Sequence, residues 1–146
     1  YHLYTLREHG ITVAGPPISP LIAQIDPDDM RRAAAPLGMT WLEQSHHDPT
    51  WLEWISEQRY QAFVILTLCR LLYTLETGSV TSKPAAARWA KGALGPHWAP
   101  FIERALTEQH SHAKTPQSDM DGTIEMVQYT ADRFQRWQST IRPAQP

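Results

Sequence analysis

The chain has 146 residues, a length that suits one domain able to bury its own core. Its 13 basic and 15 acidic side chains give a formal net charge of −2, which argues against a protein that binds nucleic acid through a basic surface. The single Cys69 excludes a disulfide framework and a cysteine zinc cage, and no apolar run approaches the ~20 residues of a membrane span. With no signal-peptide pattern either, we expect a cytoplasmic, monomeric protein.

The first fifteen residues differ in pattern from the rest. Residues 1–9 predict the end of a helix that stops at Gly10, and the β-branched run Ile11–Val13 predicts a short strand. A strand needs a sheet partner, and no later segment offers one. Because the chain also lacks an initial Met, we expect residues 1–15 to be the end of a preceding unit that contains the sheet.

Apolar residues at helical spacing predict that residues 16–146 form one all-α bundle of about five or six helices. Asp26 and Ser82 are expected N-caps, and Gly78 is an expected helix end. Helices are expected over about residues 26–45, 56–77, 82–94, 98–110 and 121–141.

The helix over 56–77 is apolar around most of its circumference, so we place it at the centre of the bundle. Pro36 to Gly38 are expected to kink or split the helix before it. Residues 45–49 are expected to form a loop, and the polar stretch 111–120 a mobile loop.

The sequence carries none of the motifs of a self-sufficient enzyme. It has no phosphate-binding Gly-rich loop, no nucleophile elbow, no zinc-protease helix, and no Gly-Ser followed by an Asp-x-Asp pair that holds two metals. The pairs His46-His47 and His110-x-His112 lack the i, i+4 spacing of helical metal ligands. We therefore predict no catalytic residue and no metal site within this chain.

Two cations are candidate ligands for an anion. Lys83 follows Ser82 at a helix N-terminus, where backbone N–H groups and the helix dipole favour phosphate, although a Lys near a helix start is also often merely solvated. Arg70 lies within the apolar helix and must be paired there. Either a structural carboxylate such as Glu76 or Glu103 pairs with it, or it reaches a ligand phosphate.

Acids and tryptophans gather before the central helix. Glu53 and Glu57, beside Trp54, suit a cationic, sugar-like ligand, because carboxylates pair with ammonium groups and indole faces stack on rings. An acid-rich first helical turn explains the same residues without a ligand.

Two other classes of protein stay open on these residues. The chain is a non-enzymatic helical interaction module if Lys83 binds no nucleotide. It is a small helical ribonuclease if Arg104 and His110 form a catalytic pair.

The run Thr67-Leu68-Cys69-Arg70, then Thr77-Gly78, Ser82-Lys83 and Ala86-x-x-Trp89-Ala90, resembles the C-terminal helical domain of aminoglycoside adenylyltransferases, the streptomycin/spectinomycin nucleotidyltransferases. The opening Leu6 to Pro16 is similar to the segment that joins the two domains of that family, and the resemblance covers roughly residues 1–137.

The resemblance implies that an N-terminal α/β nucleotidyltransferase domain carries the metal-binding acids, two magnesium ions and the catalytic base. The helical domain then closes the cleft over ATP and the antibiotic. Lys83 and Arg70 match the residues near the ATP phosphates, while the family's ATP-contacting Tyr is matched by Gln109. The chain alone is accordingly expected to be inactive, with ATP, a cationic acceptor and the N-terminal domain as its partners.

The resemblance also bears on the acceptor. The family's Asp-Trp-x-x-Asp-x-Arg stretch is similar to Glu53-Trp54-Ile55-Ser56-Glu57-Gln58-Arg59, which makes Glu53, Trp54 and Glu57 the expected acceptor contacts. That match needs about three extra residues before Val64, and an ungapped alignment places Ser56 and Tyr60 at the acidic positions instead. The parent enzyme is thus expected to confer antibiotic resistance or to act on a different amine or sugar.

Overall fold

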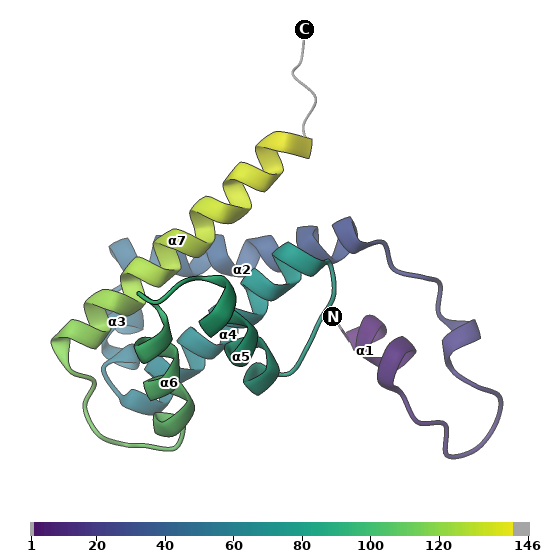
Figure 1. Ribbon diagram of the computed structural model, residues 1–146, viewed down its shortest axis with the longest axis horizontal. Helices are drawn as coiled ribbons and strands as arrows, with labels where there is room; N and C mark the ends of the chain where they lie inside the picture. Colours follow the sequence, from purple (N-terminus) through teal and green to yellow (C-terminus); the bar gives the residue numbers. More distant parts are fainter. Residues whose placement is uncertain (1, 142–146) are drawn as a thin grey trace, which may run out of the picture.

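The computed structural model describes residues 2–141, and in them the chain is all-α, as predicted (Figure 1). The described part contains seven α-helices and one 3-10 turn, and no strand. Their bounds are α1 His2–His9, η1 Ser19–Leu21, α2 Pro27–His47, α3 Pro49–Ile55, α4 Gln58–Thr77, α5 Lys83–Ala93, α6 Ala99–Glu108 and α7 Gln117–Ile141.

Helix α4 is the centre of the bundle, which confirms its predicted position. It packs against α2, α3, α5, α6 and α7, because its apolar side chains cover most of its circumference. Its fully buried residues include Ala62, Val64, Ile65, Leu68 and Cys69. Figure 1 shows α4 running behind α5 and α6, with α2 and α7 crossing the other side of the bundle.

The predicted helix ends are confirmed where side chains or glycine define them. Asp26 caps α2 through its carboxylate, which accepts the N–H of Asp28, and the Ser82 hydroxyl accepts the N–H of Ala85 at the start of α5. Gly78 ends α4 in the left-handed region at a φ of 70°. A residue with a Cβ avoids this conformation, so the glycine fixes where the turn toward α5 begins.

Two predictions about the first half of the bundle are contradicted, the split at Pro36 and the loop after Ser45. Pro36 lies inside α2 without splitting it, because the flanking turns bury Ala34, Ala35 and Trp41 in the core while Pro36 itself faces outward. Tertiary packing of that face outweighs the one backbone hydrogen bond that proline removes. The stretch 45–49 is not a loop either, since α2 continues to His47 and Asp48 caps α3 directly by accepting two backbone N–H groups.

The stretch 111–120 is not a free loop but a strap bonded to the start of α4. Arg59 and Gln58 donate their backbone N–H groups to Ser111 and Ala113, and the Thr115 N–H donates to Ser56. The buried Thr115 hydroxyl adds a bond to the Ile55 carbonyl. These bonds satisfy backbone groups of the stretch that have no partner in a helix or a sheet. Helix α7 begins within the same stretch, at Gln117.

The segment before α2 lies outside the bundle. Helix α1 forms as predicted and packs against η1, where the Arg7 guanidinium donates to the carbonyls of Ser19 and Ile22. The predicted strand Ile11–Val13 is wrong for this structure: it has no hydrogen-bonded neighbour, and Ile11 and Val13 are 90% and 96% exposed. A strand without a partner is not stable in water. The assignment of residues 1–15 to a preceding domain stays a prediction.

None of the helices in residues 2–141 is long and apolar enough to cross a bilayer.

Candidate functional site

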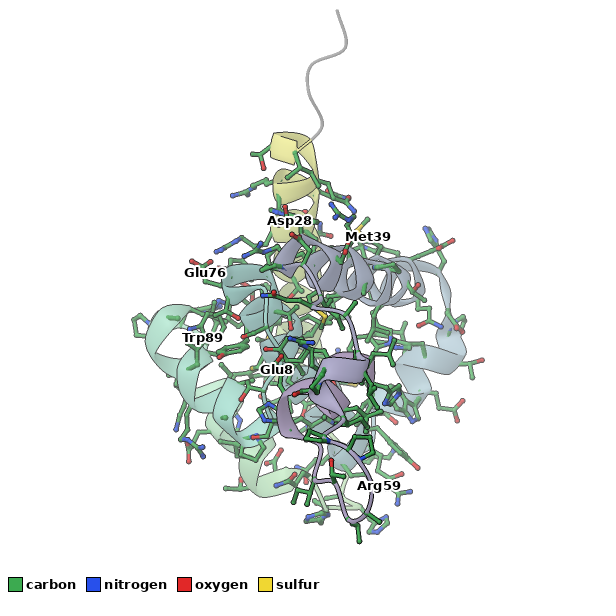
Figure 2. The ribbon with its side chains drawn as sticks, turned by 90° about the vertical axis from the view of Figure 1, so that its right-hand side faces the viewer. Glu8, Asp28, Met39, Arg59, Glu76 and Trp89 are labelled. Carbon is green, nitrogen blue, oxygen red and sulfur yellow. The ribbon has the colours of Figure 1, made fainter. Side chains whose placement is uncertain are left out.

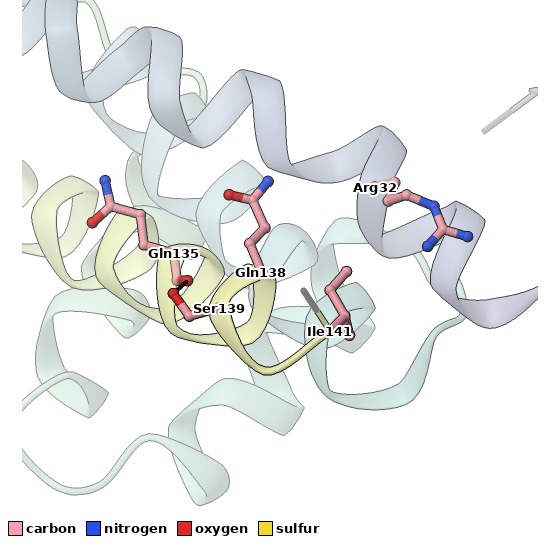
Figure 3. Close-up of a pocket in the computed structure, with 5 residues that line it drawn as sticks. All are labelled: Arg32, Gln135, Gln138, Ser139 and Ile141. Carbon is pink, nitrogen blue, oxygen red and sulfur yellow. Dashed lines mark hydrogen bonds between the residues drawn. The ribbon is translucent and has the colours of Figure 1, made fainter. Parts of the chain in front are cut away.

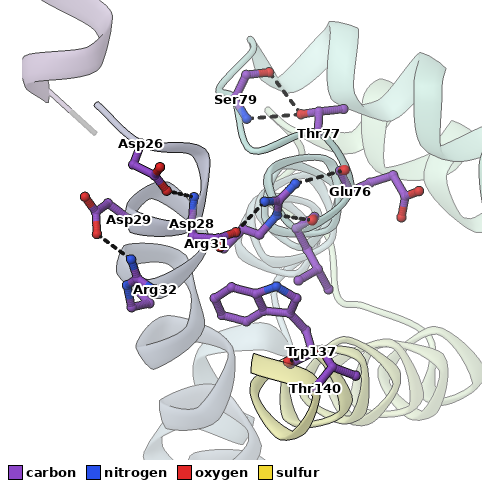
Figure 4. Close-up of polar contacts among 11 residues, drawn as sticks. Asp26, Asp28, Asp29, Arg31, Arg32, Glu76, Thr77, Ser79, Trp137 and Thr140 are labelled. Atoms are coloured by element: carbon purple, nitrogen blue, oxygen red, sulfur yellow. Dashed lines mark hydrogen bonds and ion pairs between the residues drawn. The ribbon is translucent and has the colours of Figure 1, made fainter. Parts of the chain in front are cut away.

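The turn between α4 and α5 is held in place by Arg31 of α2 (Figure 4). Its Nε donates to the Leu75 carbonyl at 2.7 Å, a terminal nitrogen donates to the Glu76 carbonyl at 3.3 Å, and Nη1 pairs with Asp28 at 2.6 Å. Arg31 thereby satisfies carbonyls at the end of α4 that have no partner within the helix. These contacts fix the end of α4 to α2. They therefore also fix the position from which residues 79–82 lead to the start of α5.

Lys83 is the first residue of α5 and is half-buried. Its Nζ lies 3.7 Å from the centre of the Phe63 ring, over the ring face. Burial lowers the pKa of Lys83, and the positive charge of Arg70 lowers it further. Lys83 is thus a partly desolvated cation beside a second cation, a situation that an anion would relieve.

Arg70 lies one helical turn beyond Leu66 on α4, and its Nε is buried without a hydrogen-bond partner. Neither of the carboxylates considered from sequence pairs with it. The Glu76 carboxylate accepts from Arg133 at 3.3 Å, and the Glu103 carboxylate pairs with Lys91 at 2.5 Å. The structural ion pairs predicted as one explanation of Arg70 are therefore wrong, because other helices supply different cations to both acids.

Arg70 faces a hollow formed by the α4–α5 turn and α1. Its lining comes from Tyr4, Thr5, His9, Arg70, Tyr73, Val80, Thr81 and Ser82. Figure 2 shows α1, with Glu8, in the foreground of this face, while Asp28 and Glu76 lie toward one end and Arg59 toward the other. The buried Nε of Arg70 and the hydroxyls of Thr81 and Ser82 give this hollow hydrogen-bonding groups that suit a phosphate.

A second hollow, of about 330 Å³, is lined in part by Lys83. We call it the aromatic hollow; it is lined by Trp54, Arg59, Tyr60, Phe63, Leu66, Lys83 and Gln109. The Trp54 and Tyr60 rings are stacked with centroids 5.1 Å apart, and Phe63 meets Trp54 edge-on at 6.0 Å. Lys83 therefore lines the hollow suited to a ring and directly follows Ser82, which lines the hollow suited to a phosphate.

The predicted acceptor residues are not brought together. Trp54 lines the aromatic hollow, but the Glu57 carboxylate is held at 2.7 Å from Arg59 Nε and 2.8 Å from His112 Nδ1. Glu53 is exposed on α3, and neither acid is among the residues that line the aromatic hollow.

Sequence reasoning named Arg59 only as part of the motif and Tyr60 only as an alternative to an acidic acceptor position, and it did not single out Phe63. Tyr60 and Phe63 are three residues apart at the start of α4 and so share a face. That spacing was the available signal, but it is also the spacing of ordinary core residues, and only the 43% exposure of Phe63 separates it from them.

Arg104 and His110, the residues of the ribonuclease alternative, are not arranged as a catalytic pair. Arg104 makes a two-point ion pair with the buried Asp119, at 2.6 and 3.1 Å. His110 is exposed beyond the end of α6. This pairing gives Arg104 a structural role in joining α6 to α7.

Two further kinds of functional feature are a metal-binding group of side chains and other hollows. Across residues 2–141 no group of three or more His, Cys, Asp or Glu side chains is placed to hold a metal ion. A polar hollow between α2 and α7 is lined by Arg32, Gln135, Gln138, Ser139 and Ile141, none of which was predicted as a site residue (Figure 3).

The fold and the site define an all-α domain in which neither Lys83, at the start of α5, nor Arg70 of α4 makes an ion pair within residues 2–141, and in which Lys83 also lines an aromatic hollow. Residues 21–133 match the family model described as "Aminoglycoside adenylyltransferase, C-terminal domain". This match covers most of the chain, which therefore belongs to that family.

Individual relatives agree with the family. An aminoglycoside (3'') (9) adenylyltransferase of Klebsiella pneumoniae is 28% identical over 123 residues, which cover 84% of this chain and 43% of the relative. Proteins with the same description from Escherichia coli and Rhizobium radiobacter are 29% and 25% identical, over 99 and 125 residues. The chain thus spans about two fifths of the length of these curated relatives. No solved structure matches it.

Proposed function

We propose that this chain is the ATP-phosphate- and acceptor-binding domain of a nucleotidyltransferase that transfers AMP from Mg-ATP to a hydroxyl of an aminoglycoside-like acceptor. The observation that carries the proposal is the pair Lys83 and Arg70: two neighbouring, partly desolvated cations to which, in residues 2–141, no ion pair with a carboxylate is assigned. Cations left in this state destabilise a fold unless an anion joins them. The relatives are described as adenylyltransferases, which gives that anion a source in ATP.

The residues fit a triphosphate. In the transfer, an acceptor hydroxyl oxygen forms a bond to the α-phosphorus, the bond to the bridging oxygen of pyrophosphate breaks, and negative charge grows on the departing phosphates. The Lys83 side chain and backbone N–H, together with Arg70 and the positive end of the α5 dipole, stabilise that charge by position alone. Bound magnesium supplies further charge neutralisation, and its ligands and the base that accepts the hydroxyl proton belong to the expected N-terminal domain.

Glu53, Trp54 and Glu57 are proposed to lie on the acceptor side. Trp54 offers a ring face, Glu53 an exposed carboxylate, and Glu57 a carboxylate that a ligand ammonium group would share with Arg59 and His112. The same proposal includes antibiotic resistance, a cytoplasmic location and a monomeric state.

The test is the affinity of the 146-residue chain for ATP and for tripolyphosphate, followed by NMR at the backbone amides of Ser82, Lys83 and Ala85. Lys83→Ala should weaken binding about tenfold, the value of one charge-assisted contact of roughly 1.4 kcal/mol. Lys91→Ala is the matched control, because it removes the same charge from the other end of α5. It should change affinity less than twofold.

The alternatives predict different results. A non-enzymatic interaction module predicts equal affinities for the wild type and Lys83→Ala. The chain alone should transfer no AMP, and measurable transfer to a panel of aminoglycosides would overturn the assignment of the catalytic groups to another domain.

A further inference from the structure

The aromatic hollow has an unusual balance of charge. Three aromatic rings line it, from Trp54, Tyr60 and Phe63, and two cations join them, Arg59 and Lys83. Its remaining lining residues, Leu66 and Gln109, carry no charge. A ligand placed here therefore meets ring faces and positive charge.

Both cations are already seated on the rings. The Arg59 guanidinium carbon lies 4.4 Å from the centre of the Tyr60 ring, and Lys83 Nζ lies 3.7 Å from the centre of the Phe63 ring. A ligand ammonium group would have to displace one of these cation–π contacts and would then stand beside a like charge. The hollow is thus unfavourable for the very group that an acidic acceptor site would select.

The carboxylate of Glu57 does not neutralise the positive charge of the aromatic hollow. Glu57 is the acid next to the hollow in sequence, but both Arg59 and His112 hold its Oε1, at 2.7 and 2.8 Å. The strap over 111–115 fixes that arrangement, since the backbone N–H groups of Gln58 and Arg59 are bonded to it. Glu57 is therefore directed to the strap and stays outside the lining of the hollow.

We propose that the aromatic hollow takes a ring of the acceptor that is uncharged or carries an anionic substituent, so that any ammonium groups of the acceptor lie outside it, toward Glu53. This inference rests on the proposed function, in which the acceptor binds next to Lys83. The ring stacks on Trp54, and an anionic substituent pairs with Arg59 or Lys83. Lys83 lines this hollow, and Ser82 before it lines the other, so the acceptor ring and the nucleotide phosphate would come together near the start of α5.

Three phenols of similar size and different charge test this proposal. They are 3-(4-hydroxyphenyl)propionate (an anion), 4-ethylphenol (uncharged) and tyramine (a cation). Each is titrated into the full 146-residue chain, and binding is followed at the indole N–H of Trp54, assigned with Trp54→Phe. The anion should bind about tenfold more tightly than tyramine, and 4-ethylphenol at least as tightly as tyramine, because like charges disfavour the cation.

Two variants locate the effect. Arg59→Gln should reduce the preference for the anion over tyramine to less than about threefold, since one of the two cations is gone. Arg32→Gln removes the same charge from the hollow between α2 and α7 and should leave the preference unchanged. Tyramine binding as tightly as the anion, or no response at the Trp54 indole, would overturn the inference.

Tripolyphosphate separates this inference from the function on which it rests. If tripolyphosphate shifts the amides of Ser82, Lys83 and Ala85 but the phenols show no charge preference, only the ring specificity is wrong. If tripolyphosphate also leaves those amides unchanged, the phosphate site itself is wrong.

Discussion

One added methyl group at the buried Gly78 should destabilise the bundle more than the same group at Gly92 or Gly95. Gly78 has a φ of 70°, and a Cβ built there would lie 2.4 Å from the Pro27 Cβ and 3.0 Å from the Pro27 Cα. The left-handed conformation costs a residue with a Cβ about 1–2 kcal/mol. The collision adds about 1–3 kcal/mol, because the backbone at the start of α2 has to move.

Two other glycines separate these contributions. Gly95 has a φ of 94° but nothing within 4 Å of a built Cβ, so Gly95→Ala measures the conformational cost alone, about 1 kcal/mol after the gain from a less flexible unfolded chain. Gly92 lies within α5 with open space around it, and Gly92→Ala should stabilise the protein by about 0.5–1 kcal/mol. Gly78→Ala should therefore cost about 2–4 kcal/mol in all.

Urea unfolding of the three variants is the assay, with the midpoint compared at an unchanged slope. The expected order of stability is Gly92→Ala, wild type, Gly95→Ala, then Gly78→Ala. Equal losses for Gly78→Ala and Gly95→Ala would refute the reasoning, because they would mean that Pro27 yields freely. Loss of tripolyphosphate binding in Gly78→Ala is also expected, since the same turn presents Lys83.

Asp119→Asn should lower the free energy of unfolding by about 1–2 kcal/mol, because the buried side chain loses its charge-assisted bonds from Arg104. The control is Asp121→Asn on the exposed side of α7, which should lower the free energy of urea unfolding by less than about 0.5 kcal/mol. Equal losses would contradict the role given to the pair. Burial raises the pKa of the Cys69 thiol to about 12, so the folded chain keeps its proton while the unfolded chain releases it above about pH 9. Stability should consequently fall between pH 9 and 12, by at most about 1.4 kcal/mol per pH unit from this group, and Cys69→Ala should fall less steeply. A thiol reagent at pH 8 should label Cys69 only after unfolding, and fast labelling of the folded chain would show that α4 is not closed over it.

The sequence by itself determined the class of the fold and the local geometry at the start of α5. Helical periodicity identified α4 as the central helix, and the chemistry of Ser82 and Gly78 identified where helices begin and end, because capping depends on residues a few positions apart. Lys83 was placed at a helix N-terminus for the same reason.

Where the sequence misled, long-range contacts outweighed local preference. Pro36 is a helix breaker by itself, but the buried faces on both sides of it keep α2 continuous. The polar stretch after α6 has no periodicity, yet its backbone is bonded to the start of α4, more than fifty residues away. The strand expected at Ile11–Val13 had a local preference for that form but no partner in the chain.

Only the tertiary structure decided the partners of the charged residues. Glu76 lies on α4 with Arg70, and Glu103 lies on the neighbouring helix α6, but Arg133 and Lys91 pair with those acids instead. Glu57 is close to Trp54 in sequence, but its carboxylate pairs with His112, a residue that follows α6 in the chain. Charge partners are chosen by distances across the bundle, and residue spacing along one helix carries no information about those distances.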